Sequence, residues 1–313
     1  MGTAKSPRFG TSLMRSHPTA PATADSPTGH AERIAALRHS PSYRQSHLDP
    51  DFMGREELRP VRLQLELLKP ELVMQENGIA STIVVFGGTR VIEPEAAKQR
   101  LLRCRQELAK KPADPRLQRS VRIAENVLKK AHYYEEAREL ARIVSTQGNH
   151  DGKLENVICT GGGPGIMEAA NRGAHDVGAK SIGLNITLPF EQEPNSFISP
   201  ELCFEFKYFA IRKMHFLMRA KAMVAFPGGF GTLDELFEAL TLIQTHRMQP
   251  MPVVLFGRDY WAKLIDWQMF VDEGTIAPED LELVRFAETA QECWQIIADF
   301  YRSATSDRLP RGQ

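Results

Sequence analysis

The alternation of short apolar runs with longer helical stretches constrains the fold of this chain more than any other feature. The apolar runs are rich in β-branched or aromatic residues and are expected to form strands over residues 81–86, 157–160, 181–186, 203–209, 222–226 and 252–256. Helical patterns are expected over residues 94–111, 115–147, 164–177, 211–220, a stretch ending near 245, 260–273 and 289–302. Strands joined through helices run parallel, and a parallel sheet must be covered on both faces. The sequence therefore predicts an α/β fold with a doubly wound parallel sheet.

The N-terminal part of the chain does not share this alternation. It is rich in Pro, Ser, Thr, His and Ala without a sustained periodicity, so we expect most of the first fifty residues to be disordered. Apolar residues at three- and four-residue steps then predict a helical arm packed on the main domain, broken at Pro60 and Pro70. The expected parts are a disordered segment, this arm, a main α/β domain and a flexible tail, at residues 1–50, 51–78, 79–303 and 304–313.

The composition excludes several classes of protein. The 39 Lys and Arg residues balance 39 Asp and Glu residues, whereas nucleic acids and membrane surfaces select a basic face. No apolar run is long enough to cross a bilayer, and the N-terminus lacks the apolar core of a secretory signal. The 4 Cys residues have no C-x-x-C spacing, which favours reduced thiols over a metal site or disulfides. We therefore expect a cytoplasmic protein with no nucleic-acid, membrane or metal partner.

Two glycine-rich loops follow strands and lie at the carboxyl ends of those strands, where open α/β sheets bind ligands. The first runs from Thr160 to Glu168 and the second from Pro227 to Glu235. Glycine lets the backbone approach a ligand closely, and the free N–H groups at the start of a following helix favour phosphate. Pro164 suits the first position of such a helix. The candidate phosphate- or ribose-binding residues are Gly161, Gly162, Gly163, Gly165, Gly228, Gly229, Gly231 and Thr232.

The loops match neither of the common nucleotide motifs. G-x-G-x-x-G fails because Glu168 and Asp234 stand at the last glycine position, and Asn185 stands where a dinucleotide site needs an acidic residue. No G-x-x-x-x-G-K-[ST] motif occurs, which excludes a P-loop. Glycines that only make tight turns are the structural alternative, and it weakens when two loops occupy corresponding positions in one sheet. The loops therefore favour a monophosphate site.

Glu235 is the candidate catalytic carboxylate, and its spacing from Thr232 has two explanations. Thr232-x-x-Glu235 matches a capping box, in which the glutamate only bonds the N–H of the helix cap. A carboxylate one turn from an anion-binding loop is electrostatically costly, which suggests chemistry instead. Such a carboxylate stabilises the cationic sugar that forms when an N-glycosidic bond breaks. Arg212 likewise has either a solvated place at a helix end or a role in bridging phosphate or ribose.

Together these residues resemble the Lonely Guy (LOG) family of nucleoside 5′-monophosphate phosphoribohydrolases, often mislabelled lysine decarboxylases. The family signature P-G-G-x-G-T-x-x-E is matched in full from Pro227 to Glu235, its R-K pair by Arg212 and Lys213, and its glycine loop by residues 161–165. The resemblance covers residues 79 to the end of the chain.

The resemblance implies a fold, an activity and a set of roles. The fold is a Rossmann-like sheet, here with an N-terminal helical appendage, and the assembly is a homo-oligomer, a dimer or larger. The activity is that of an N-glycosyl hydrolase, which releases adenine or N6-modified adenine from the monophosphate and leaves ribose 5-phosphate without a metal or organic cofactor. Glu235 and Arg212 would be the catalytic pair, and Thr232 would hold the phosphate with the two loops. Further candidate substrate contacts are Gly88, Lys213, Glu168 and Asn185.

The chain departs from the short, plant-like members of that family in its N-terminal arm, in the helical stretch at about 94–147 and in the run at 183–195. These features resemble the longer bacterial members and leave the base open between adenine, as in an AMP nucleosidase, and a cytokinin. Two other functions also stay open. One is a non-catalytic carrier of a nucleotide or molybdenum cofactor on the same fold, which needs no Glu235. The other is a pyridoxal-phosphate decarboxylase with Lys213 as its Schiff-base lysine.

Overall fold

The computed structural model describes residues 27–147, 149–150, 153–189 and 193–306. Contacts within the chain divide it into two units, residues 1–60 and 61–313. The second unit contains the sheet and every candidate site residue. Among the described residues, no helix is both long enough and apolar enough to span a bilayer.

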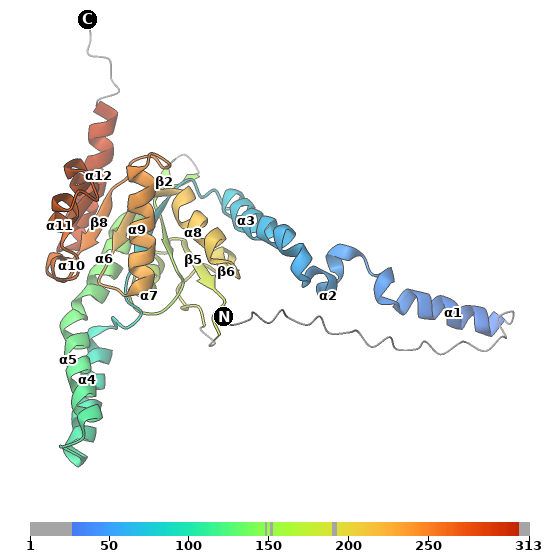
Figure 1. Cartoon of the computed structure of the whole chain (residues 1–313), viewed down its shortest axis with the longest axis horizontal. Coiled ribbons are helices and arrows are strands. Elements are labelled where there is room, and N and C mark those ends of the chain that lie inside the picture. The colour runs from blue at the N-terminus through green and yellow to red at the C-terminus, as the bar shows by residue number, and fades with distance from the viewer. Residues whose placement is uncertain (1–26, 148, 151–152, 190–192, 307–313) are drawn as a thin grey trace, which may run out of the picture. The chain divides into compact units, whose positions relative to one another are not determined.

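The second unit is built on a parallel sheet of 7 strands in the order β6-β5-β4-β1-β7-β8-β9 (Figure 1). The chain starts at the centre with β1, extends the sheet on one side through β4, β5 and β6, and then returns to the other side of β1 with β7. This order confirms the predicted doubly wound α/β fold and places the topological switch point at β1. The bounds are β1 Thr82–Phe86, β4 Val157–Thr160, β5 Ser181–Ile186, β6 Cys203–Phe206, β7 Ala220–Ala225, β8 Val253–Phe256 and β9 Val284–Ala287.

One strand of this sheet was not expected from the sequence. The edge strand β9 has only four residues and carries Arg285 between Val284 and Phe286, so its apolar run is too short to recognise. It is held by parallel pairing with β8. A separate antiparallel pair, β2 at Asn149–His150 and β3 at Lys153–Leu154, precedes β4.

Helices cover both faces of the sheet. One face packs against α6 (His132–Thr146), α7 (Ile166–Asp176) and α12 (Ala290–Ser306) through side chains such as Ile83 and Val85 of β1. The opposite face packs against a second set of helices through Val84 and Phe86. Those helices are α3 at Arg59–Glu76, α8 at Phe209–Met218, α9 at Phe230–Gln244, α10 at Arg258–Leu264 and α11 at Trp267–Asp272.

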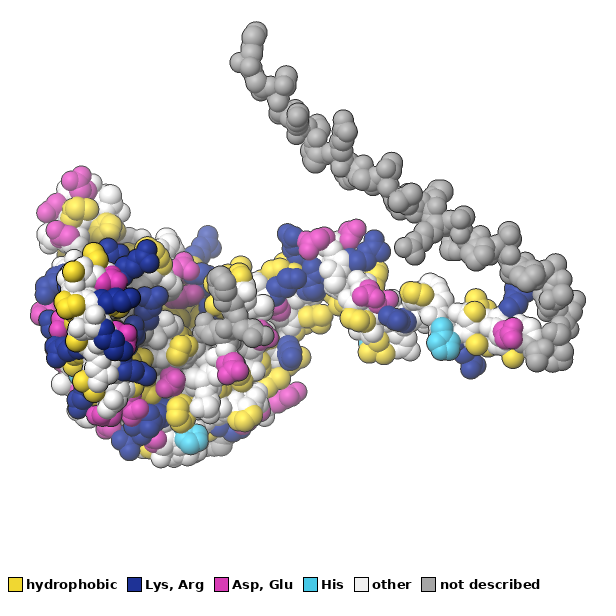
Figure 2. Space-filling view, turned by 90° about the horizontal axis from the view of Figure 1, so that it is seen from below, with side chains coloured by type: hydrophobic (Ala, Val, Ile, Leu, Met, Phe, Trp, Pro, Cys, Tyr) yellow, Lys and Arg dark blue, Asp and Glu magenta, His cyan; other side chains and the backbone are white. Residues whose placement is uncertain are grey.

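Two expected helices are each divided in the structure. The stretch 115–147 forms α5 (Pro115–Lys130) and α6, and the stretch 260–273 forms α10 and α11. Helix α5 pairs with α4 (Pro94–Lys110) through a small core of Leu101, Val121 and Ala124. Figure 1 shows this helical hairpin extending from the sheet, and Figure 2 shows Lys and Arg side chains gathered on the face from which it projects.

Helix α3 corrects the expectation that Pro60 and Pro70 break the arm. Pro60 lies in the first turn of the helix, where no N–H is needed, and Pro70 lies inside the helix. The proline at position 70 removes the donor for the carbonyl of Glu66, and the ring of His215 contacts that carbonyl instead, with Nε2 at 3.3 Å. Burial of Pro70 against the domain also favours the continuous helix. Most of the expected arm therefore belongs to the main unit.

Of residues 1–50, for which disorder was expected, the structure describes residues 27–50, and these form helices and turns. From residue 27 onward the first unit forms short helices whose side chains are largely exposed. Alanine, leucine and arginine in α1 are good helix formers, so local propensity supports this helix without a core. Residues 1–26 and 307–313 lie outside the described residues, and the expected tail begins inside α12. The elements are α1 at Pro27–His39, η1 at Pro41–Tyr43, η2 at Ser46–Leu48, α2 at Pro50–Met53 and η3 at Glu56–Leu58.

The close packing of α6 on α7 depends on Gly173. A Cβ at this position would overlap the carbonyl oxygen of Arg138 and lie 2.8 Å from the Cβ of Ala141. We expect Gly173→Ala to lower the free energy of unfolding by about 1–3 kcal/mol, because the two helices must separate. Urea unfolding followed by circular dichroism measures this. Gly231→Ala, at a helical glycine with no atom near its Cβ position, is the matched control and should not destabilise the protein.

Candidate functional site

A cleft of about 270 Å³ lies at the carboxyl ends of β1, β4 and β7. The switch point of the sheet places it there, since β1 pairs with both of the other strands. Of the fourteen residues expected from the sequence, seven line it. Its lining is Phe86, Gly87, Gly88, Thr89, Gly161, Met167, Phe209, Arg212, Gly229, Gly231, Thr232, Asp234 and Glu235.

A hydrogen-bond network inside the protein holds the first glycine loop. The backbone N–H of Gly162 donates to the hydroxyl of Thr160, which donates in turn to the buried side chain of Asn171. The side-chain amide of Asn195 donates to the carbonyls of Gly162 and Gly163, at 3.1 Å in each case. The sequence analysis gave Asn171 and Asn195 no role, because neither belongs to a glycine motif. Their bonds hold the loop through groups of the protein itself.

Two glycines of the first loop have positive φ angles, which explains the residue type at these positions. Gly162 has φ +74° and Gly165 has φ +77°. Gly165 is also the N-cap of α7, so the helix begins at Ile166, two residues later than the start expected at Pro164. Gly161 is the member of the loop that lines the cleft.

Two further candidate contacts point elsewhere. The carboxylate of Glu168 accepts a hydrogen bond from the Tyr134 hydroxyl at 2.8 Å, and the amide of Asn185 donates to the carbonyl of Phe204 at 3.3 Å. Neither Glu168 nor Asn185 lines the cleft. Asn185 instead packs where a side chain on Gly162 would lie.

The second glycine loop is tied to the loop after β1. The backbone N–H of Gly88 donates to the carbonyl of Pro227 at 2.9 Å. Helix α9 has Gly229 as its N-cap, with no side-chain cap bond. Thr232 is thus inside the helix and does not cap it, and the alternative of a capping box between Thr232 and Glu235 is wrong. The side chain of Glu235 is free for another partner.

That partner is Lys213 on α8. Its ammonium lies 3.3 Å from the carboxylate of Glu235, 3.0 Å from that of Asp234 and 2.6 Å from that of Glu238. Glu235 is only 5% exposed. Burial raises its pKa above the ordinary value of 4.5, and the charge and hydrogen bond of Lys213 offset part of this rise. The site therefore holds a buried carboxyl whose ionised form is favoured by Lys213 and, to a smaller extent, by the charge of Arg212.

Arg212 lines the cleft beside the first glycine loop. Its Nε donates to the carbonyl of Leu184 at 2.7 Å, and a terminal nitrogen donates to the carbonyl of Gly161 at 3.3 Å. Burial lowers the pKa of Arg212, and the charge of Glu235 opposes this effect. Within the described part of the chain, no carboxylate lies within salt-bridge distance of this guanidinium. Its remaining donors are available to an anionic or hydroxyl-bearing ligand.

Helix α3 fixes the start of α8, the helix that carries Arg212 and Lys213. The carboxylate of Glu66 accepts hydrogen bonds from the backbone N–H groups of Lys207 and Tyr208, at 2.9 and 3.1 Å. Arg62 donates to the Tyr208 hydroxyl at 3.1 Å. Sequence reasoning missed Glu66 because its partners lie more than a hundred positions away in the chain.

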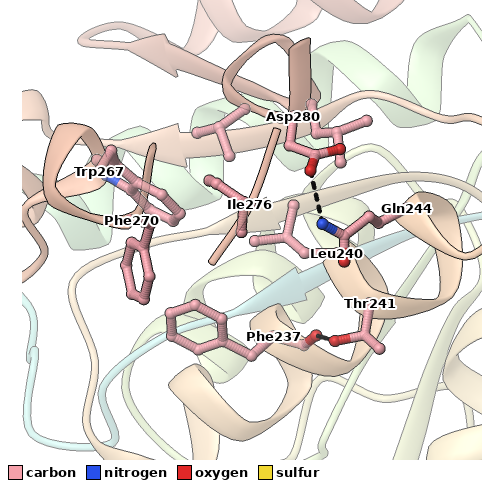
Figure 3. A pocket seen from close by; sticks show the side chains of 10 residues that line it. Phe237, Leu240, Thr241, Gln244, Trp267, Phe270, Ile276 and Asp280 are labelled. Carbon is pink, nitrogen blue, oxygen red and sulfur yellow. Dashed lines mark hydrogen bonds between the residues drawn. The ribbon is translucent and has the colours of Figure 1, made fainter. Parts of the chain in front are cut away.

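Two other features bear on what the cleft contains. In the described ranges, no group of three or more His, Cys, Asp or Glu side chains is arranged to hold a metal ion. A smaller hollow of about 140 Å³ lies beside α9, lined by Phe237, Trp267, Phe270 and other apolar residues (Figure 3). The hydrogen bond from Gln244 to Asp280 lies at its edge, and none of the site residues lines it.

The link between Lys213 and Glu235 gives a direct prediction. Because Lys213 lowers the pKa of Glu235, Lys213→Met should raise that pKa further. The charge of Glu238 acts in the opposite sense, so Glu238→Gln should lower the pKa of Glu235. Carbon-13 NMR titration of the glutamate carboxyl carbons measures both shifts. An unchanged pKa in Lys213→Met would show that the lysine does not control the acid.

Comparisons with known proteins identify the family of this chain. A family model described as "Possible lysine decarboxylase" matches residues 167–297. The chain is 31% identical over 150 residues to cytokinin riboside 5′-monophosphate phosphoribohydrolase LOG3 of Arabidopsis thaliana, covering 46% of this chain and 67% of that protein. It is 30% identical over 176 residues to the probable phosphoribohydrolase LOG6 of the same plant, covering 55% of this chain and 82% of that protein.

A solved structure, the molybdenum cofactor binding protein from Rippkaea orientalis, covers 54% of this chain and 88% of its own, with 19% identity and a TM-score of 0.39. That likeness is too distant to bear on function. The curated relatives carry the assignment, together with the P-G-G-x-G-T-x-x-E signature that forms the cleft: the chain belongs to the LOG family.

Proposed function

We propose that this protein hydrolyses the N-glycosidic bond of a purine nucleoside 5′-monophosphate and releases the free base and ribose 5-phosphate. The observation that carries the proposal is the buried carboxyl of Glu235, which shares one cleft with Arg212 and with both glycine loops. The relatives named as phosphoribohydrolases support the reaction class. AMP and N6-modified AMP are the substrates to compare first.

Cleavage of the N-glycosidic bond needs a group that stabilises positive charge on the sugar. As the bond between C1′ and the base nitrogen breaks, the sugar gains oxocarbenium character. The carboxylate of Glu235 stabilises that charge, and it orients the water whose hydroxyl adds to C1′. The second proton of that water leaves with the base. The ionised form of Glu235 is therefore the active one, and Lys213 favours that form.

The roles of the other residues follow from their positions. The backbone N–H groups at the start of α9 and around Gly88 are proposed to bind the phosphate. Thr232 is buried beside Gly228 and lines the cleft, so its hydroxyl is placed to contact the ligand. Arg212 is proposed to bind ribose or phosphate oxygens with the donors that the protein leaves free.

Two observations weigh against the other functions considered from the sequence. A Schiff-base lysine needs a lowered pKa. Burial does lower the pKa of Lys213, but its bonds to Glu238 and Asp234 and the charge of Glu235 outweigh burial and raise it. A non-catalytic carrier gains nothing from a buried glutamate beside an anion site, since that carboxylate repels the bound phosphate.

We also propose that the enzyme acts in the cytoplasm as a homo-oligomer. Helix α8 exposes large apolar side chains of Phe209, Met214 and Met218, at 52%, 47% and 48%. Phe209 lines the cleft, so a second copy covering α8 would border the site. The interface between the two copies would therefore lie next to the cleft that contains Glu235.

The first test is substitution of the acid. Glu235→Gln should keep the fold and lower kcat by about 10²- to 10⁴-fold, because the amide stabilises neither the cationic sugar nor the attacking water. Base release from AMP and from isopentenyladenosine monophosphate, followed by chromatography, measures this. Glu238→Gln is the matched control, since Glu238 also bonds Lys213 but does not line the cleft. Full activity in Glu235→Gln would contradict the assignment.

The pH dependence of the reaction follows from the same carboxyl. A raised pKa means that Glu235 gains its proton at a higher pH than an ordinary glutamate. The value of kcat/KM should therefore fall on acidification with a midpoint above pH 4.5. The measurement is a pH profile with AMP at fixed ionic strength. A midpoint at or below that value would mean that another group sets the acidic limb.

A further inference from the structure

A second cavity, of about 630 Å³, opens on the other side of the second glycine loop. It shares Gly88, Thr89 and Gly229 with the cleft that holds Glu235, so the two spaces meet over these residues. Helix α5 forms its outer wall. The full lining is Gly88, Thr89, Arg90, Val91, Ile123, Asn126, Val127, Lys130, Pro227, Gly228, Gly229, Phe230 and Tyr260.

The two spaces differ in charge. The second cavity is lined by two cations, Arg90 and Lys130, and by no carboxylate. The cleft is lined by Arg212 together with the carboxylates of Asp234 and Glu235. A ligand with one anionic end and one end that becomes cationic would thus be oriented by both spaces. Its anionic end is attracted to the second cavity, and its cationic end is attracted to the carboxylates of the cleft.

Lys130 is held in place by a neighbouring ring, and neither cation of the second cavity is neutralised by a carboxylate. The ammonium of Lys130 lies over the ring of Tyr260, 4.9 Å from its centroid, and the Tyr260 hydroxyl donates to the carbonyl of Gly228 at 2.5 Å. These contacts connect α5 to the second glycine loop. Across the ranges that the structure describes, no carboxylate lies within 4.0 Å of Lys130 or Arg90. Two uncompensated charges facing one cavity favour an anionic ligand.

We propose that this cavity binds the 5′-phosphate of the nucleotide, with Arg90 and Lys130 as its cationic contacts. The sugar then passes over Gly229, and C1′ faces Glu235. This assignment deepens the proposed function and rests on it for the identity of the substrate. It also keeps the phosphate dianion away from Glu235, whose charge would otherwise repel it. The helical hairpin of α4 and α5 then contributes to phosphate binding, since α5 supplies Lys130.

Binding measurements test the proposal without relying on turnover. The probes are ribose 5-phosphate, which has no base to lose, and adenosine, which has no phosphate, each titrated calorimetrically into the full chain. Lys130→Met and Arg90→Gln should each raise the Kd for ribose 5-phosphate by about tenfold, the size expected for one charge-assisted hydrogen bond, and leave that for adenosine unchanged. Lys130→Arg should restore binding, because it keeps the charge.

The matched control is Lys129→Met. Lys129 is the exposed neighbour on α5 and does not line the cavity, so its removal should change neither Kd. Equal melting temperatures for all variants show that they are folded. Loss of adenosine binding in parallel with ribose 5-phosphate, unchanged affinities, or no binding of ribose 5-phosphate by the unsubstituted chain would each overturn the proposal.

A separate assay distinguishes failure of the subsite from failure of the proposed function. If the unsubstituted chain binds ribose 5-phosphate but releases no base from any monophosphate, the hydrolase is wrong, and the Kd values still decide the subsite. If base release occurs while Arg90→Gln and Lys130→Met bind ribose 5-phosphate normally, the hydrolase stands and the phosphate lies elsewhere.

Discussion

Parallel pairing of β1 with β4 on one side and β7 on the other is the constraint on which the site depends. The pairing aligns the ends of these strands, so that the loops at Gly88, Gly161 and Gly228 meet at one edge of the sheet. Helices α8 and α9 then flank that edge and carry Lys213 and Glu235 toward each other. Residues as far apart in the sequence as Phe86 and Glu235 thus line one cleft, and the hydrogen bond from Gly88 to Pro227 joins two of its loops.

The fold was predictable where periodicity is strong. The buried strands β4 and β5 occur at the residues expected, because an apolar run bounded by turn residues has few other solutions. The edge strand β9 was not found, since half of its side chains face away from the core. Helix α3 was misjudged at Pro70, because the acceptor left by the proline is satisfied from another helix, and no local pattern shows that.

The site was predictable only where a compact motif encodes it. The signature from Pro227 to Glu235 gave the second loop and the acid, and Arg212 followed from the family pattern. The contacts that support these residues come from distant parts of the chain. Three of them are hydrogen bonds between a side chain and a backbone group, made by Asn195, Glu66 and Tyr260. Since every residue type has backbone groups, the sequence of the partner does not reveal such a bond. Glu168 is the converse case: its place in a glycine motif suggested a ligand contact, whereas its carboxylate accepts a hydrogen bond from Tyr134 and it does not line the cleft.

The anchoring of α3 also defines where a minimal folded fragment begins. A division at residue 79, as composition suggests, would remove the carboxylates of Glu66 and Glu71. The N–H groups of Lys207 and Tyr208 would then lose their acceptor, and Arg219 would lose its ion-pair partner. A division at residue 60 keeps these contacts, because they all lie within the second unit. The catalytic body of this protein is thus longer than its strand pattern, and its first structural element is a helix rather than a strand.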